Sequence, residues 1–249
     1  MTDLNSIVDW FHRKRRAAAS EGEVLEIYFQ HHPRTSFLKM LAQDAKVVDI
    51  GAGDGSLSVF RSWPRPKRAD LKMYAYSIEK GSHFDQFEDY RLSDWNKEMP
   101  VFDGVRFDAA VSAHFIEHIR EPESIVDWLK LHLVDGGRAY VEWPSPNSID
   151  LPSRHALIDA GVELIISRFD DDDTHRAGLP DRAAMCSAFR ENGFEIEQEG
   201  VIRMPWIEEQ LMATQRDNTD RFPRQAAFWL MTGWSQYLIA RKIQCRLSQ

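Results

Sequence analysis

The chain has 249 residues, of which 43% are hydrophobic, and its 31 Lys and Arg against 39 Asp and Glu give a net charge of −8. The length suits one α/β domain with additions, and the negative charge argues against a broad nucleic-acid interface. No stretch approaches the ~18 apolar residues of a membrane span, so integral membrane association is not expected. Two cysteines, Cys186 and Cys245, indicate reduced thiols in a cytoplasmic protein.

The first 30 residues predict a helical segment ahead of the main domain, which we place at residues 31–249. Apolar residues recur at helical spacing over residues 4–11, and the basic run 13–16 follows them. A linker at residues 21–23 separates this helix from a second one near residues 24–30. The basic run indicates a solvated helix end, and contact with acidic lipid or nucleic acid is the weaker alternative.

A glycine-rich loop is the most informative pattern in the chain. A short β-branched run ends in Asp49-Ile50, and Gly51, Gly53 and Gly55 follow at G-x-G-x-G spacing. The run predicts a buried parallel strand, and the glycines allow a sharp turn with a ligand close to the main chain. Dinucleotide loops have G-x-G-x-x-G spacing instead. An acid beside the loop would repel a pyrophosphate but suits a cationic, amine-bearing ligand. Residues 56–60 can start the next helix.

Strands and helices then alternate along the chain. The strand candidates are residues 72–78, 106–112, 139–143 and 236–242, together with one strand before Asp94-Trp95 and one that starts at Gly193. Glu79 directly follows the first of these strands, and Ser112 is the last residue of the strand at 106–112. One helix is expected to carry Ile125, Leu129 and Leu133 on one face, and a second is expected over residues 181–192. Prolines exclude a helix over residues 61–70. Asp135-Gly136-Gly137 is expected to form a turn before the fifth strand. The alternation predicts an α/β fold.

The order and spacing of these patterns resemble the class I S-adenosylmethionine (AdoMet)-dependent methyltransferase superfamily, in particular its ubiquinone-pathway O-methyltransferase and methyltransferase-11 type group. The resemblance implies a Rossmann-like, seven-stranded, mostly parallel sheet with helices on both faces. It also implies AdoMet as the cofactor, with Glu79 accepting hydrogen bonds from the ribose, and Asp94 and Trp95 holding the adenine. The residues implied in cofactor binding are Asp49, Gly51, Ala52, Gly53, Gly55, Glu79, Asp94, Trp95 and Ser112.

Two segments, residues 144–180 and 205–233, exceed what this fold needs. Connections of this length in a compact domain usually carry structure or function. Both are expected to lie near the carboxyl edge of the sheet, where open α/β sheets bind ligands. We therefore expect helical insertions that form a substrate cover, with most of their aromatic residues in the core of that cover.

The group His114-Phe115-Ile116-Glu117-His118 directly follows the fourth strand. It matches the H-x-x-E-H pattern of inverted zinc proteases. A protease is nevertheless excluded, because the group lies within the pattern of a methyltransferase. Its spacing places the three polar side chains on one face of a helix. It resembles the metal-binding E-x-x-E-H group of ubiquinone-pathway and small-RNA 2′-O-methyltransferases, with His114 in place of the first acid. His175, in Thr174-His175, resembles a further histidine that approaches this site in the ubiquinone group.

A metal-free site is the favoured interpretation, and the alternative that the resemblance implies is a divalent metal at His114, Glu117, His118 and His175. The candidate catalytic residues are His118, His175 and His114, and without metal His118 or His175 would be the general base. The favoured function is O-methylation of a small organic acceptor, such as a sugar, a phenol or a natural-product intermediate. The alternatives are 2′-O-methylation of RNA and a non-catalytic AdoMet-binding module. Nucleic acid is not the expected partner, and a homodimer is left open.

Overall fold

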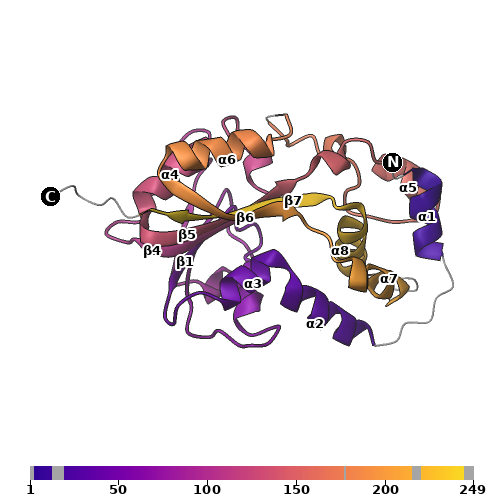
Figure 1. Ribbon diagram of the computed structural model, residues 1–249, viewed down its shortest axis with the longest axis horizontal. Coiled ribbons are helices and arrows are strands. Elements are labelled where there is room, and N and C mark those ends of the chain that lie inside the picture. Colours follow the sequence, from indigo (N-terminus) through magenta and orange to yellow (C-terminus); the bar gives the residue numbers. More distant parts are fainter. Residues whose placement is uncertain (1–2, 13–19, 177, 215–219, 244–249) are drawn as a thin grey trace. The chain divides into compact units, whose positions relative to one another are not determined.

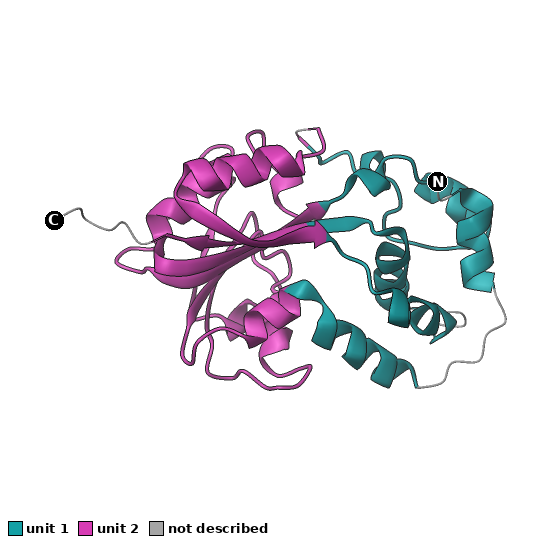
Figure 2. Ribbon diagram, in the orientation of Figure 1, with its two compact units in different colours: residues 1–33, 144–175, 201–236 teal, residues 34–143, 176–200, 237–249 magenta. Residues whose placement is uncertain are grey.

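The computed structural model describes residues 3–12, 20–176, 178–214 and 220–243 (Figure 1). The basic run at residues 13–16 and Cys245 lie outside this part of the chain. The chain forms two compact units, each assembled from three segments (Figure 2). Unit 1 comprises residues 1–33, 144–175 and 201–236, and unit 2 comprises residues 34–143, 176–200 and 237–249.

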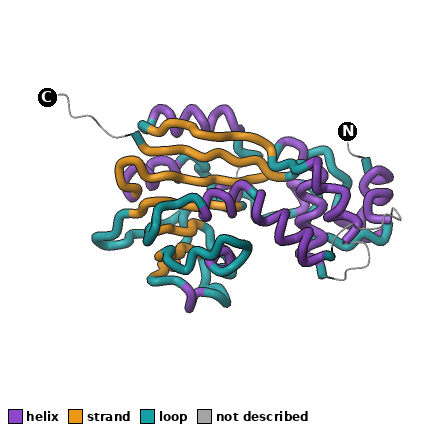
Figure 3. Tube along the Cα trace, turned by 60° about the horizontal axis from the view of Figure 1, so that its bottom comes forward, coloured by secondary structure: helices purple, strands orange, loops and turns teal. Residues whose placement is uncertain are grey.

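A seven-stranded sheet forms the framework of unit 2 (Figure 3). The strands are β1 (Lys46–Ile50), β2 (Lys72–Ser77), β3 (Asp89–Leu92), β4 (Phe107–Ala113), β5 (Leu133–Pro144), β6 (Phe194–Val201) and β7 (Ser235–Lys242). Their order is β3-β2-β1-β4-β5-β7-β6, and β1 pairs in parallel with both β2 and β4. The pairs β2–β3 and β4–β5 are also parallel. The predicted Rossmann-like, mostly parallel sheet is therefore confirmed.

The sheet is buried on both faces because successive residues of its central strands enter two different cores. Val47 of β1 belongs to the core that contains Phe37 of α3 (Pro33–Lys39). Val48 belongs to the opposite core, which contains Leu129 of α4 (Ser124–His132) and Phe189 of α6 (Arg182–Glu191). Continuous apolar strands are typical of sheets covered on both sides. Helices therefore flank both faces, as expected (Figure 1).

Two local predictions differ from the structure. The expected turn at Gly136-Gly137 lies inside β5, where the pairing with β4 shifts register between Phe107 and Ala109. Gly136 has a φ of +79°, so the two glycines form a bulge in a long strand rather than a turn ahead of a short one. The expected helix after the glycine loop is a 3-10 helix, η1 (Ser56–Arg61). The prolines that follow it prevent a longer helix.

The remaining 3-10 helices are single turns. They are η2 (Phe84–Gln86), η3 (Ile116–His118), η4 (Pro146–Ser148) and η5 (Phe169–Asp171).

Unit 1 is mainly helical (Figure 2). Its helices are α1 (Leu4–His12), α2 (Glu21–His31), α5 (Arg154–Asp159), α7 (Pro205–Thr214) and α8 (Arg221–Thr232). Helix α7 packs against α1, α2 and α8, and α1 also contacts α5. The predicted linker at residues 21–23 is instead the first turn of α2, because Ser20 and Glu23 form a capping box. The N-terminal segment and both insertions thus share one unit, and their role as a substrate cover stays a prediction.

Within the described ranges, none of the helices has both the length and the apolar character required to cross a bilayer.

Candidate active site

The glycine loop between β1 and η1 has the geometry of a ligand-binding turn. The backbone N–H groups of Gly51 and Ala52 donate to the carbonyl of Tyr76 on β2, at 2.9 and 2.8 Å. Gly51 has a φ of +80°, and a Cβ there would lie 2.6 Å from Phe115, so a larger residue does not fit. At Gly53 no atom of the described residues lies within 4 Å of the position that a Cβ would take. This open space beside the main chain fits a bound cofactor that passes close to the backbone.

A second loop, residues 78–83, packs directly on the glycine loop. Glu79 lies two residues beyond the end of β2 with an exposed side chain, and its role as the ribose ligand stays a prediction. The His83 N–H donates to the Asp54 carbonyl at 2.9 Å. A Cβ on Gly81 would lie 2.4 Å from the Asp54 backbone, so the two loops touch main chain to main chain. Sequence reasoning did not identify Gly81.

The adenine-binding pair differs in part from the prediction. Trp95 is only 6% exposed, and its ring packs edge-on against Tyr76 and Phe115. Its Nε1 donates to Ser124 Oγ at 2.9 Å. The indole is therefore a core residue with little surface left for a ligand. Asp94 is partly exposed, and the backbone N–H of Asn96 donates to its carboxylate, which lowers the pKa of Asp94.

Asp49 and Ser112 lie buried at the ends of β1 and β4. Burial raises the pKa of the Asp49 carboxyl to about 7; Arg34 partly offsets this shift, and Asp54 adds to it. A bound cation would favour ionised Asp49, which agrees with a site for an amine-bearing cofactor. Among the described residues, Ser112 Oγ has no hydrogen-bond partner although it is buried. A bound molecule would satisfy this hydroxyl.

His114 joins two buried carboxylates. Its Nδ1 lies 3.3 Å from Glu117 Oε1, and its Nε2 lies 3.0 Å from Glu142 Oε1. Tyr140 donates its hydroxyl to Glu142 Oε2 at 2.6 Å, and Arg34 Nε lies 3.9 Å from the same oxygen. Burial by itself would lower the pKa of His114, but the hydrogen bonds and charges of Glu117 and Glu142 raise it to about 9. His114 is therefore a cation at neutral pH.

This arrangement corrects the predicted roles of His114. Both ring nitrogens already face carboxylates, so the imidazole has no lone pair for a metal or for a substrate proton. The predicted single helical face is also wrong, because His114 has a φ of +54° and η3 begins only at Ile116. Sequence reasoning missed Glu142, Tyr140 and Arg34. The sequence signal that could have identified Glu142 is an acidic residue inside the otherwise apolar end of β5.

Glu117 and His118 remain as candidate reactive groups of unit 2. A carboxylate oxygen of Glu117 and a ring nitrogen of His118 lie within 4.8 Å of each other. Glu117 is 1% exposed, and its Oε2 has no hydrogen-bond partner among the described residues. A buried oxygen without a partner costs about 1–3 kcal/mol, so this atom calls for a donor or cation from a bound molecule. The N–H of Arg176 donates to the Glu117 carbonyl at 3.0 Å.

His175 precedes Arg176 in the chain and belongs to unit 1. Its ring stacks on Phe169 with centroids 4.2 Å apart, and its Nε2 lies 3.9 Å from Asp172 Oδ2. Its approach to Glu117 and His118 stays a prediction.

Comparisons with known proteins identify the family of this chain. The methyltransferase domain family matches residues 13–199 of the chain. No curated protein matches the sequence. Among solved structures, an S-adenosylmethionine-dependent methyltransferase from Mesorhizobium loti is 13% identical, with a TM-score of 0.53 over 83% of this chain and 96% of that chain. A SAM-dependent methyltransferase from Aquifex aeolicus is 10% identical, with a TM-score of 0.51 over 90% of this chain and 100% of that chain.

A third similar structure is a complex between the Trm112 methyltransferase activator and a candidate methyltransferase from Haloferax volcanii. It is 15% identical, with a TM-score of 0.51 over 90% of each chain. At such identities the similarity concerns the fold alone, whereas the family match covers most of this chain. The chain therefore belongs to the methyltransferase domain family, and it is an S-adenosylmethionine-dependent methyltransferase.

Proposed function

We propose that this enzyme methylates a hydroxyl oxygen of a small organic acceptor, such as a sugar, a phenol or a natural-product intermediate. The observation that carries the proposal is the pair of His118 and buried Glu117 after β4, beside a His114 that is held as a cation. A hydroxyl is a weak acid and needs a base, and imidazole is the side chain that exchanges a proton most readily near neutral pH.

The residues of unit 2 divide the work between binding and proton transfer. AdoMet supplies a methyl group that its sulfonium already activates. The loop at Gly51–Gly55 and Glu79 bind and orient the donor, and Asp49 faces its positive charge. His118 accepts the proton of the acceptor hydroxyl, and the carboxylate of Glu117 stabilises the imidazolium that forms. Holding the acceptor oxygen in line with the methyl group of the donor can lower the barrier to methyl transfer by about 7–11 kcal/mol.

A metal is the competing explanation for Glu117 and His118. His114 is already engaged at both nitrogens, so two of the four predicted ligands remain in unit 2. A catalytic metal site usually has three protein ligands. The residues of unit 2 therefore do not make such a site by themselves, and a metal would require His175 as well. His175 is also the alternative base.

Methyl-labelled AdoMet tests the acceptor class directly. The enzyme is incubated with panels of sugars, phenols and amines and, separately, with total tRNA. We expect label on a small hydroxyl compound and none on tRNA. Label on tRNA would favour RNA methylation, and label on an amine would overturn O-methylation. AdoMet binding by calorimetry without transfer to any panel would show that the acceptor belongs to none of these compound classes.

Variants of the proposed base separate its role from cofactor binding. With the acceptor identified, His118→Ala should lose about 10²–10⁴ in kcat, the usual contribution of a general base, at unchanged AdoMet affinity. His175→Ala gives the same comparison for the second candidate. Gly53→Val should instead abolish AdoMet binding, because its side chain would fill the open space at the loop.

A chelator distinguishes the base from a metal. If His118 acts as a base, EDTA leaves the rate unchanged. Loss of turnover with EDTA, restored by a divalent metal at constant AdoMet affinity, would show a metal instead. Full activity in both alanine variants with EDTA present would exclude both roles.

A further inference from the structure

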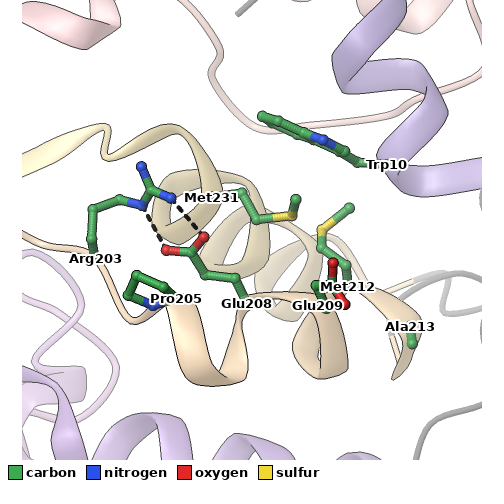
Figure 4. A pocket seen from close by; sticks show the side chains of 8 residues that line it. All are labelled: Trp10, Arg203, Pro205, Glu208, Glu209, Met212, Ala213 and Met231. Carbon is green, nitrogen blue, oxygen red and sulfur yellow. Dashed lines mark hydrogen bonds and ion pairs between the residues drawn. The ribbon is translucent and has the colours of Figure 1, made fainter.

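Unit 1 contains a pocket of its own (Figure 4). Its volume is about 250 Å³, and residues from α1, α7, α8 and the segment before α7 line it. The lining residues are Trp10, Arg203, Pro205, Glu208, Glu209, Met212, Ala213 and Met231. None of them belongs to the glycine loop or to the group after β4, so the methyl-transfer machinery does not account for this pocket.

About half of the pocket wall is apolar, and this half suits a flat ring. The indole of Trp10 and the thioethers of Met212 and Met231 border the same space (Figure 4). Methionine side chains are flexible and polarisable and contact aromatic rings favourably, and indole faces stack with other rings. An apolar cavity of about 150 Å³ can hold benzene. A pocket of about 250 Å³ therefore has room for one ring with a short substituent.

A fixed ion pair forms the polar end of the pocket. Arg203 donates from Nε to Glu208 Oε1 at 2.6 Å and from Nη2 to Glu208 Oε2 at 2.7 Å (Figure 4). The N–H of Met204 also donates to Glu208 Oε1, at 3.2 Å, and Glu208 is 7% exposed. The pair is thus anchored in the fold. Within the part of the chain that the structure describes, the other three N–H groups of Arg203 have no protein acceptor.

The charges at this end select an uncharged ligand with an acceptor atom. Glu208 neutralises Arg203, so the ion pair has no net charge that would attract an anion or a cation. The outer edge of the guanidinium disfavours a cation beside it. A neutral carbonyl or hydroxyl oxygen could accept from the Arg203 N–H groups without displacing Glu208.

We propose that this pocket is a second binding site, for a small uncharged aromatic molecule whose carbonyl or hydroxyl oxygen accepts a hydrogen bond from Arg203. The ring lies against Trp10, Met212 and Met231, and the oxygen faces the outer edge of the guanidinium. Binding at this site can be measured without methyl transfer, so its test needs no turnover assay and does not depend on the identity of the acceptor.

The test uses benzamide as the probe and methionine methyl groups as reporters. The full-length protein is labelled with ¹³C at its methionine methyl carbons, and Met212→Leu and Met231→Leu assign the two pocket signals. Titration with benzamide should shift these two signals along one saturable curve and leave the other methionine signals in place. No saturable shift, or saturable shifts confined to other methionines, would overturn the proposal.

Two tryptophans provide a matched pair of variants. Trp10→Ala removes the ring wall and should weaken benzamide binding at least tenfold. Trp206→Ala removes an exposed tryptophan of α7 that does not line the pocket, and should leave the affinity unchanged. Equal effects of the two changes would overturn the placement. Amide exchange of α7 in both variants verifies that unit 1 keeps its fold.

Related probes test the polar end. Benzamide should bind more tightly than toluene, which lacks the oxygen, and more tightly than benzoate or benzylamine, which carry charge. In Arg203→Lys the cation opposite Glu208 remains but the outer edge of the guanidinium is lost, so the preference for benzamide over toluene should shrink at least fivefold. Tighter binding of either charged probe, or an unchanged preference in Arg203→Lys, would overturn the proposed ligand class.

Discussion

At the scale of single residues, His114 holds together two carboxylates that would otherwise repel each other. Glu117 and Glu142 are 1% and 2% exposed, and the imidazolium lies between them. The residue adopts a φ of +54°, which is uncommon for a side chain other than glycine. Its backbone N–H donates to the Glu142 carbonyl at 2.8 Å, so β5 holds this conformation in place.

We predict that His114→Ala strongly destabilises the protein. Removing one member of a buried charge group leaves the other charges uncompensated, which costs about 3–5 kcal/mol. Denaturant unfolding at pH 7 measures the change. His155→Ala, at an exposed histidine, should remain within about 0.5 kcal/mol of the unaltered protein. If both variants unfold at the same denaturant concentration, the charge group does not contribute as described.

The raised pKa of His114 predicts that stability falls in mild base. The pKa is about 9 in the folded protein against an ordinary value of 6.5. The stabilisation is therefore complete below about pH 6.5 and is lost as the pH rises through 9, and it amounts to roughly 3 kcal/mol. Denaturant midpoints measured from pH 6 to pH 10 should show this decrease in the unaltered protein and a smaller one in His114→Ala. Parallel profiles would contradict the assignment.

Asp49 should release a proton when AdoMet binds. Its pKa is about 7 without ligand, because burial disfavours the carboxylate. A bound cation lowers that pKa, so the affinity should rise as the pH increases from 6 to 8. Calorimetry at pH 6.5 in buffers of different ionisation enthalpy counts the released protons. In Asp49→Asn the amino group of AdoMet can still titrate, but the Asp49 carboxyl is gone, so this variant should release fewer protons on binding. Equal proton release by the two proteins would contradict this role of Asp49.

At the scale of elements, the cofactor site depends on how two loops meet. The glycine loop follows β1 and the loop at residues 78–83 follows the neighbouring, parallel β2. Parallel pairing brings the carboxyl ends of both strands to one edge. Gly81 then lets the second loop approach Gly53 and Asp54 without a side chain between them.

Gly81→Ala should therefore weaken AdoMet binding. The added methyl group would lie 2.4–2.5 Å from backbone atoms of Gly53 and Asp54, so the loops must separate and Glu79 must shift away from the glycine loop. We expect the Kd to rise about tenfold or more, equivalent to about 1.4 kcal/mol.

The matched control is Gly22→Ala in α2, where no atom of the described residues lies within 4 Å of the added methyl group. Alanine favours a helix over glycine, so this variant should keep its affinity and be at least as stable as the unaltered protein. An unchanged Kd in Gly81→Ala would show that the loops tolerate the separation.

At the scale of the whole molecule, unit 1 is held together by segments that are far apart in the sequence. Helix α1 buries Ile7 and Phe11 and contacts α5 and α7, which lie on the two insertions. Burial of a large side chain contributes about 1.5–3 kcal/mol. The N-terminal segment thus stabilises the fold of both insertions.

Phe11→Ala should loosen unit 1 selectively. The lost contacts should increase amide hydrogen exchange in α7, while the strands of unit 2 retain their protection. Mass spectrometry of exchanged peptides measures both regions in one experiment. Asp9→Ala, at an exposed position of the same helix, is the control and should not alter α7. Uniform loss of protection over both units would contradict their separate stability.

Local sequence patterns were sufficient to predict the framework of this protein. The succession of strands along the chain, the glycine loop and the position of Glu79 after β2 follow from local patterns. Strand periodicity and glycine spacing are properties of neighbouring residues. The helix at α6 and the last strand followed in the same way. The bulge in β5 was missed because the neighbouring strand decides the backbone there. The linker expected at residues 21–23 and the longer helix expected at η1 were wrong for local reasons, the Ser20–Glu23 capping box and the prolines after η1.

The chemistry of individual side chains depended instead on contacts that form when the chain folds. His114 was a reasonable base or metal ligand until β5 brought Glu142, 28 residues away, against its second nitrogen. Trp95 was a reasonable adenine contact until Tyr76 and Phe115 enclosed it. The pocket around Trp10 combines residues that are about 200 positions apart. Periodicity along a chain reports which face of an element is buried, but the charge state and accessibility of a side chain depend on partners that only folding brings near.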